Sequence, residues 1–340
     1  MLNKMKITIG SLLFFISAIN IAGAQINLDM GSAFNTIGES MPEIIMDPPH
    51  PQPQEIVKLT INDYKGDYTN NIVEWFENGK KIPNTDNLRE IKINSGDSGE
   101  TKVIKIVYTD PNKLIKKESI VEISPVYIDI ILEPQTHVPD FYAGRALPTA
   151  GSITNVTAVV DSDISKDNLI YIWKINNNSF GGINGGRGVN KTYFTTPNRN
   201  SILTLTVKTD YGKILGRRVI FVKLAEPEIL FYETNSLLGT LGNRTLEDTV
   251  FIKNNTITIT SEPYFLDSRV YNQPSYINWS IDGRKVSVGD NPYKITLKET
   301  GLDSDGENIK RNKLSNISFI VQGDNEFIMQ GARKEINIKI

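Results

Sequence analysis

The sequence contains no cysteine and only 2 histidines among its 340 residues. Without cysteine the chain can form no disulfide bond, no thiolate metal site and no cysteine nucleophile. Its 37 lysines and arginines nearly balance 39 aspartates and glutamates, so the net charge of −2 gives no overall field that would attract a nucleic acid. No combination of the remaining residues identifies a reaction. We therefore predict that the protein is not an enzyme and binds no nucleic acid.

The first 24 residues have the pattern of an export signal. Lys4 and Lys6 precede an apolar run over 7–21, and the small residues Ala22-Gly23-Ala24 follow it. The run is shorter than the about 20 residues of a membrane-spanning helix. We expect cleavage after Ala24 and no membrane span in the mature chain, with a retained anchor as the alternative. Residues 25–42 are predicted to be a flexible segment.

Export of a chain without cysteine favours a bacterial source, because small secreted domains elsewhere usually carry disulfides. The predicted location is extracellular or on the cell surface, or periplasmic if the cell has an outer membrane.

The three tryptophans recur at intervals of roughly 100 residues, which indicates tandem modules. Trp75, Trp173 and Trp279 each follow a segment in which apolar and polar residues alternate, as in a half-buried strand. With 39% hydrophobic residues, the chain can build a core in each module. The predicted domains are 43–125, 126–225 and 226–340, with a proline at each junction. Because proline limits backbone freedom, we expect a semi-rigid rod.

Short alternating segments separated by turn residues surround each tryptophan, and they predict an all-β fold of three antiparallel β-sandwiches. Asn78-Gly79 and Asp282-Gly283 are predicted to be hairpin turns, since both positions tolerate positive φ. No helical pattern is found after residue 25. The expected strands are 56–62, 90–94, 102–109, 116–123, 128–132, 152–160, 192–195, 202–208, 216–222, 229–233, 256–260, 293–298, 317–322 and 335–340.

Two of the units resemble immunoglobulin-like domains. The first contains Trp-x-x-Asn-Gly-Lys-Lys-Ile from Trp75, and the third contains Trp-x-x-Asp-Gly-Arg-Lys-Val from Trp279. The middle unit resembles the PKD-type sandwich through Tyr171-x-Trp173 and Tyr193-Phe194-Thr195-Thr196-Pro197, with Asn176-Asn177-Asn178 where that family has Gly-Asp-Gly. The chain as a whole resembles exported bacterial proteins built from tandem repeats of this kind, and the resemblance implies a structural or adhesive role.

Aromatic residues divide into expected core and possible contact positions. Trp75, Trp173 and Trp279 are predicted to fill the cores, because an indole can bridge two packed sheets. Phe141 and Tyr142 are predicted either to pack between domains or to form an exposed contact patch, whose rings could stack on sugars. Arg187 lies in a glycine-rich loop over 181–188 and is a further contact candidate, since loops at sandwich ends often carry recognition.

Two motifs raise the question of a metal or catalytic site. Asp303, Asp305 and Glu307 place carboxylates two residues apart, a spacing that could supply oxygen ligands to calcium. We interpret them as an acidic turn, with a weak calcium site as the alternative and no other cofactor expected. Gly96-Asp97-Ser98-Gly99 matches the nucleophile motif of trypsin-like proteases, and we interpret it as a turn between two strands.

These observations predict a non-catalytic structural or adhesive protein, exported to the bacterial cell surface or envelope, whose modules bind a protein or cell-envelope partner. The alternative is a glycan-binding accessory protein. A hydrolase with an unrecognised site is a third possibility.

Overall fold

The computed structural model describes residues 41–66, 68–112, 115–181, 186–252, 256–298, 314–323 and 330–339. Strands dominate this part of the chain, and the predicted all-β fold is confirmed. Its helical segments are single turns, η1 (Lys166–Asn168), α1 (Ser268–Tyr271) and η2 (Pro274–Tyr276). In the described ranges no helix is long and apolar enough to cross a membrane. The export pattern of residues 1–24 and the acidic residues Asp303, Asp305 and Glu307 lie outside the described residues.

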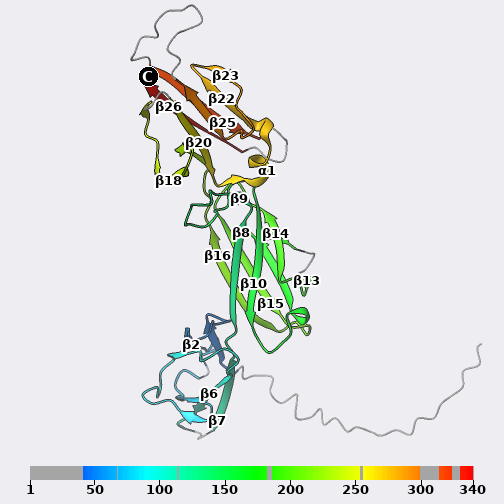
Figure 1. Ribbon diagram of the computed structural model, residues 1–340. Coiled ribbons are helices and arrows are strands. Elements are labelled where there is room, and N and C mark those ends of the chain that lie inside the picture. Colours follow the sequence, from blue (N-terminus) through cyan, green and yellow to red (C-terminus); the bar gives the residue numbers. More distant parts are fainter. Residues whose placement is uncertain are drawn as a thin grey trace, which may run out of the picture.

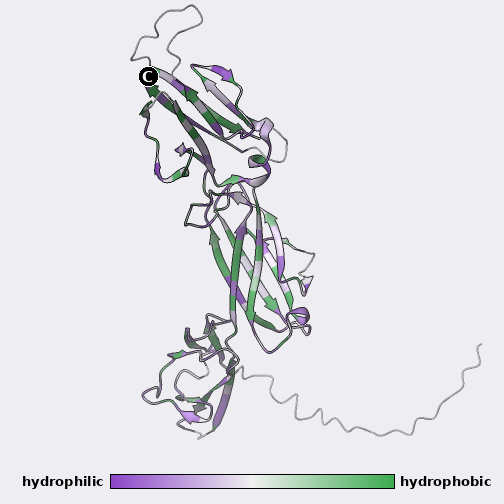
Figure 2. Ribbon diagram, in the orientation of Figure 1, coloured by the Kyte–Doolittle hydropathy of each residue, from purple (hydrophilic) through white to green (hydrophobic). Residues whose placement is uncertain are grey.

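The molecule is elongated, with three strand-rich bodies following one another along it (Figure 1). Each body has its own cluster of buried hydrophobic residues. Hydrophobic and hydrophilic residues alternate along the strands (Figure 2), so each sheet can turn one face to a core. We refer to the bodies as the first, middle and C-terminal sandwich. The domain boundaries at 125/126 and 225/226 remain predictions.

The first sandwich packs a three-stranded sheet on a four-stranded one. The first sheet orders β1 (Glu43–Asp47), β2 (Ile56–Asn62) and β5 (Glu90–Asn94), and the second orders β4 (Lys80–Lys81), β3 (Ile72–Glu77), β6 (Lys102–Thr109) and β7 (Lys116–Ile123). In β2 the buried residues Val57, Leu59 and Ile61 alternate with more exposed ones, and they pack around Trp75. The alternation that predicted the strand therefore also selects its core face.

The middle sandwich also consists of two antiparallel sheets. One orders β14 (Lys191–Thr195), β10 (Ile153–Asp161) and β8 (Tyr127–Pro134). The other orders β12 (Asn178–Phe180), β11 (Ile170–Ile175), β15 (Ser201–Lys208) and β16 (Ile214–Val222), and β13 (Gly186–Arg187) pairs with β11. Val156, Ala158 and Val160 of β10 point into the core around Trp173, so Asn155 and Thr157 lie on the outer face.

The C-terminal sandwich has the same layout with more strands. One sheet orders β18 (Gly239–Thr245), β17 (Glu228–Asn235), β20 (Thr256–Tyr264) and β24 (Lys294–Lys298). The other orders β19 (Thr249–Phe251), β26 (Gly331–Lys339), β25 (Leu314–Gln322), β22 (Ile277–Ile281) and β23 (Arg284–Val286), with β19 parallel to β26. Trp279 stacks on Phe231 of the opposite sheet, with ring centroids 5.7 Å apart. The indole thus connects the two sheets of this core.

The three tryptophans occupy equivalent positions. Their exposed fractions are 0% for Trp75, 0% for Trp173 and 1% for Trp279. Each indole N–H donates to a backbone carbonyl of a connecting segment, at 2.9, 3.2 and 2.8 Å; the acceptors are Leu88, Val189 and Pro292. Each ring is therefore buried and its single polar group is satisfied, which makes these residues structural.

A tight hairpin turn begins three residues after each tryptophan. Both central residues have positive φ, at Asn78-Gly79 (48° and 81°), Asn176-Asn177 (47° and 70°) and Asp282-Gly283 (47° and 78°). This confirms the two turns predicted from Asn-Gly and Asp-Gly. In the middle sandwich two asparagines make the same turn, because asparagine also tolerates the left-handed conformation.

The first residue of each turn also bonds the next strand of its sheet. The side-chain Oδ1 accepts the backbone N–H of Val103, Ile202 and Asn316, at 2.9, 3.0 and 2.8 Å respectively. The side chain therefore fixes the hairpin against β6, β15 or β25. A glycine in its place could adopt the same φ but could not make this bond.

We expect Asn176→Ala to lower the free energy of unfolding of the middle sandwich by about 2 kcal/mol, because the substitution removes the bonds to Ile202 and Ser201 and places Cβ at a positive φ. Asn176→Gly should cost less, since it loses the bonds but relieves the backbone. Urea unfolding of both variants, followed by hydrogen exchange of the backbone amides of β11 and β15, tests this. Equal stability of the wild-type chain and the alanine variant would contradict it.

Candidate functional site

The junction between the middle and C-terminal sandwiches contains a strand pair, a buried polar network and an aromatic cluster; we call it the second junction. The strand pair joins β9 (Thr136–His137) to β21 (Leu266–Asp267). In the sequence, β9 comes between β8 and β10, and β21 follows β20. The N–H of Phe265 donates to the carbonyl of His137 at 2.7 Å, and that of Ser268 to the carbonyl of Gln135 at 3.0 Å. Backbone hydrogen bonds therefore run directly from one sandwich to the other.

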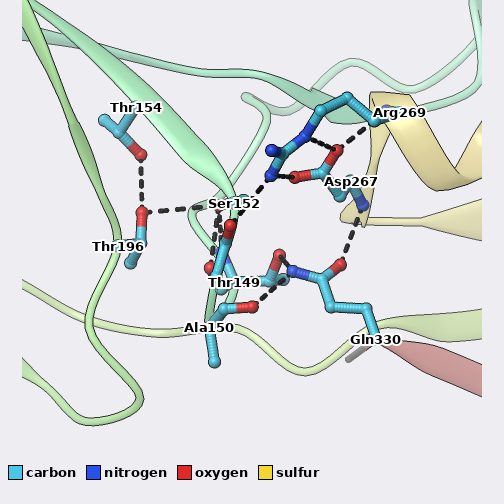
Figure 3. A network of polar contacts seen from close by, with 9 residues as sticks. Thr149, Ala150, Ser152, Thr154, Thr196, Asp267, Arg269 and Gln330 are labelled. Carbon is cyan, nitrogen blue, oxygen red and sulfur yellow. Dashed lines mark hydrogen bonds and ion pairs between the residues drawn. The ribbon is translucent and has the colours of Figure 1, made fainter. Parts of the chain in front are cut away.

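Gln330 connects the two sandwiches through its side chain (Figure 3). It directly precedes β26 and is only 6% exposed. Its Nε2 donates to Thr149 Oγ1 at 2.9 Å and to the carbonyl of Ala150, and its Oε1 accepts the N–H of Asp267 at 3.0 Å. A buried amide with all these partners holds its neighbours in one arrangement, because breaking any bond leaves a buried polar group unpaired.

Asp267 and Arg269 form the second part of the network. The Asp267 side chain is 1% exposed, and its carboxylate lies 2.8 Å from Arg269 Nη2. The carboxylate also accepts the backbone N–H of Arg269 at 2.8 Å, so Asp267 is the N-cap of α1. Arg269 Nη2 donates to the carbonyl of Gly151 at 3.0 Å, across the junction. The hydrogen bonds with Asp267 raise the pKa of the Arg269 guanidinium.

The segment that receives these bonds is itself held in place by buried hydroxyl groups. Ser152 Oγ accepts the N–H of Thr149 at 3.1 Å and donates to its carbonyl at 2.8 Å, which closes a tight turn. Thr154 and Thr196 share a hydrogen bond of 2.9 Å beside this turn (Figure 3). The acceptors at Thr149 to Gly151 are therefore held in place by hydrogen bonds within the middle sandwich.

Phe141 and Tyr142, the two contact candidates, lie in the aromatic cluster of the second junction. Phe141 packs edge-to-face on Tyr232 of β17, with ring centroids 5.1 Å apart. Tyr142 packs edge-to-face on Tyr264 of β20 at 5.4 Å. A Cβ added to Gly242 would lie 2.5 Å from the Phe141 ring, so only glycine allows this approach. Both aromatic residues contact the C-terminal sandwich, although Phe141 keeps 40% of its surface exposed.

His137 packs in the same cluster. Its ring stacks on Tyr271 with centroids 3.5 Å apart, and its Nε2 lies 3.8 Å from a carboxylate oxygen of Glu262. Tyr271 stacks in turn on Tyr293, and burial raises the pKa of both phenols, which stay neutral at physiological pH. Across the described residues, no three histidines, aspartates or glutamates come together as a metal site.

The junction between the first and middle sandwiches has fewer bonds. Gln52 Oε1 accepts the N–H of Ile128 at 3.0 Å. Ser98 Oγ donates to the carbonyl of Asp161 at 3.4 Å. Gly96 and Gly99 both have positive φ, so the protease-like motif is a glycine turn whose serine bonds a backbone carbonyl. Burial, aided by the charge of Arg217, lowers the pKa of nearby His50.

Arg187 lies at an end of the middle sandwich. Its guanidinium forms an ion pair with Asp210 at 2.9 Å and donates to Asn168 Oδ1 at 2.8 Å. It thereby ties β13 to η1 and to the turn between β15 and β16. The side chain is 59% exposed, but its charge is already paired, so an anionic ligand would have to compete with Asp210.

The residues that make the second junction polar are absent from the sequence-based candidates. Gln330 is 181 positions from its partner Thr149, and Arg269 is 118 positions from Gly151. Neither lies in a motif or a periodic pattern. Of the residues at this junction, only Phe141 and Tyr142 are contact candidates in the sequence, because they are adjacent aromatic residues.

The sequence matches no protein-family model and no curated protein. Similar solved structures include three N-terminal domains of the bacteriophage RB49 highly immunogenic outer capsid protein, at 10% identity over 88% of this chain and 98% of that one, with a TM-score of 0.24. The central fibronectin-III array of RIM-binding protein is 12% identical over 88% and 96%, with a TM-score of 0.27. Bacteroides ovatus SGBP-B in complex with a mixed-linkage heptasaccharide is 15% identical over 88% and 70%, with a TM-score of 0.20. At these values the similarities support no inference about the function of this chain.

Proposed function

We propose that the protein is a non-catalytic modular spacer in which three β-sandwich domains, 43–125, 126–225 and 226–340, form a semi-rigid rod that presents its surface to a protein or cell-envelope partner. The second junction is the observation that supports this proposal. Two domains on a loose linker would share few contacts, whereas here a strand pair, a buried amide and the Arg269 guanidinium cross the junction. A rod keeps its two ends at a fixed separation, which a structural or adhesive protein requires.

We further propose that the chain is exported to the surface or envelope of a bacterium. The pattern of residues 1–24 and the absence of cysteine support this location. Partners of a rod outside the cytoplasm would be other proteins, envelope components or glycans. Nothing in the near-neutral charge favours a nucleic acid.

Export predicts a defined mature chain. When the full sequence is expressed in a bacterial host, we expect the protein outside the cytoplasm with Gln25 as its first residue. Intact-mass measurement of the exported fraction tests this, because loss of residues 1–24 is resolved directly. A chain that carries its full mass and sediments with the membrane would show that the segment is a retained anchor.

Glycan binding is a second candidate function, and a specific surface favours it. Tyr142 packs against Tyr264 and offers little free ring to a sugar. Tyr193, in contrast, is 62% exposed beside an open polar hollow on the middle sandwich. This second function therefore depends on side chains of the middle sandwich that belong neither to the polar network nor to the aromatic cluster of the second junction.

A further inference from the structure

The outer face of the sheet β14-β10-β8 carries six residues in two straight rows. Asn155 of β10 lies opposite Glu133 of β8 and opposite Tyr193 of β14. Two residues along, Thr157 lies opposite Ile131 and Lys191 in the same way. Side chains on one face of a sheet recur every second residue, so both rows point away from the core. The buried neighbours Val156 and Phe194 confirm the direction.

These rows border an open hollow of about 460 Å³, lined by the six residues together with Val156 and Thr192. This volume lies within the range of roughly 300–1,000 Å³ that is usual for small-molecule sites. The strand spacing of about 4.8 Å makes each row about 10 Å long. The hollow is therefore long enough to accept more than one sugar ring along a row.

The polar side chains of the rows are available to a ligand. Within the described part of the chain, the side chains of Glu133, Asn155 and Lys191 make no hydrogen bond or ion pair with another residue. Tyr193 is 62% exposed, and its ring stacks on no other ring of the described residues. This face therefore combines an unpaired carboxylate, amide and ammonium group with one exposed aromatic ring.

We propose that this face binds a neutral oligosaccharide, with a sugar ring stacked on Tyr193 and its hydroxyls bonded to Glu133 and Asn155. An aromatic ring offers an apolar surface to the C–H face of a pyranose. A carboxylate accepts hydrogen bonds from hydroxyls, an amide both donates and accepts, and the Lys191 ammonium donates. One acidic and one basic side chain leave the hollow without net charge, which favours a neutral ligand over an acidic one. This site rests on the second candidate function, glycan binding, and not on the rod.

The test uses the full chain without residues 1–24, titrated by calorimetry with cellohexaose, xylohexaose, mannohexaose and chitohexaose. We expect at least one hexasaccharide to bind, and Tyr193→Ala to weaken its binding at least tenfold. Glu133→Gln should weaken it about fivefold, because a hydrogen bond to a charged acceptor is replaced by one to a neutral acceptor. The unfolding midpoint of both variants should match that of the wild-type chain, since both side chains are exposed.

Tyr127→Ala is the matched control. Tyr127 is 42% exposed on the same face of β8, six residues and therefore about 20 Å from Glu133. Its removal should leave sugar binding unchanged. Binding that survives Tyr193→Ala would overturn this site while leaving glycan binding by the protein intact. Failure of the wild-type chain to bind any of the four sugars would overturn both the site and the glycan function.

Discussion

Replacing Trp173 by alanine is expected to unfold the middle sandwich. The indole is fully buried, donates to the carbonyl of Val189 and packs near Phe180, with ring centroids 6.1 Å apart. Burial of about 200 Å² at about 25 cal/mol per Å² corresponds to about 5 kcal/mol as an upper bound. Most domains have only about 5–15 kcal/mol of stability in total. Without a disulfide between the sheets, little remains to compensate for this loss.

Hydrogen exchange followed by mass spectrometry would locate the effect, because amides of β10, β11 and β15 should lose their protection while β2 and β6 keep theirs. Trp173→Phe should retain part of the core and a cooperative transition. Tyr211→Ala is a suitable control, since Tyr211 is 99% exposed in the turn between β15 and β16. A Trp173→Ala chain that melts cooperatively near the wild-type temperature would contradict the structural role of this residue.

Asp267→Ala is expected to loosen the second junction. The substitution removes the cap of α1 and the ion pair with Arg269, and it frees the guanidinium from the geometry in which it reaches the carbonyl of Gly151. Loss of these bonds should weaken the coupling between the sandwiches by about 2–3 kcal/mol. Small-angle scattering should then show a broader range of end-to-end distances, and a protease should cut near the junction more rapidly.

The matched control for this experiment is Arg244→Ala, which breaks an ion pair with Glu247 whose side chains are 79% and 77% exposed. An exposed pair contributes little, so scattering and proteolysis should not change. Gln330→Ala should reproduce part of the Asp267→Ala effect, because it leaves the N–H of Asp267 and the hydroxyl of Thr149 without a partner. Unchanged scattering curves for both junction variants would show that the rod does not depend on this network.

The secondary structure was largely predictable because its signals are local. The alternation in 56–62, 90–94, 102–109 and 116–123 predicted β2, β5, β6 and β7 with the bounds that the structure shows. Asn78-Gly79 and Asp282-Gly283 predicted their turns, since positive φ is a property of the residues themselves. The short strands β9, β12, β13 and β21 had no such signal. Two or three residues cannot display a period, and these strands exist only because a neighbouring strand is present to pair with them.

The roles of the glycine-rich loop and of the aromatic pair depend on residues distant in the sequence. The loop makes Arg187 a contact candidate, but its charge is paired with Asp210, which comes near only through the folding of β15 and β16. Phe141 and Tyr142 could belong to a packed junction or to an exposed patch, and only the positions of Tyr232 and Tyr264 distinguish the two. Tyr193 was part of the motif that resembled a PKD-type sandwich, yet nothing local indicated that Glu133 and Asn155 would share its row.

The amino-acid sequence by itself determined the all-β fold, the repeat of about 100 residues and the position of one tryptophan in each core, because periodicity and turn chemistry act between residues close in the chain. Only the tertiary structure decided which sandwiches are joined by hydrogen bonds across their junction and which polar side chains line the same hollow. Those features join side chains that are far apart in sequence, such as Gln330 and Thr149, and their contacts arise from the packing of whole sheets rather than from any local preference.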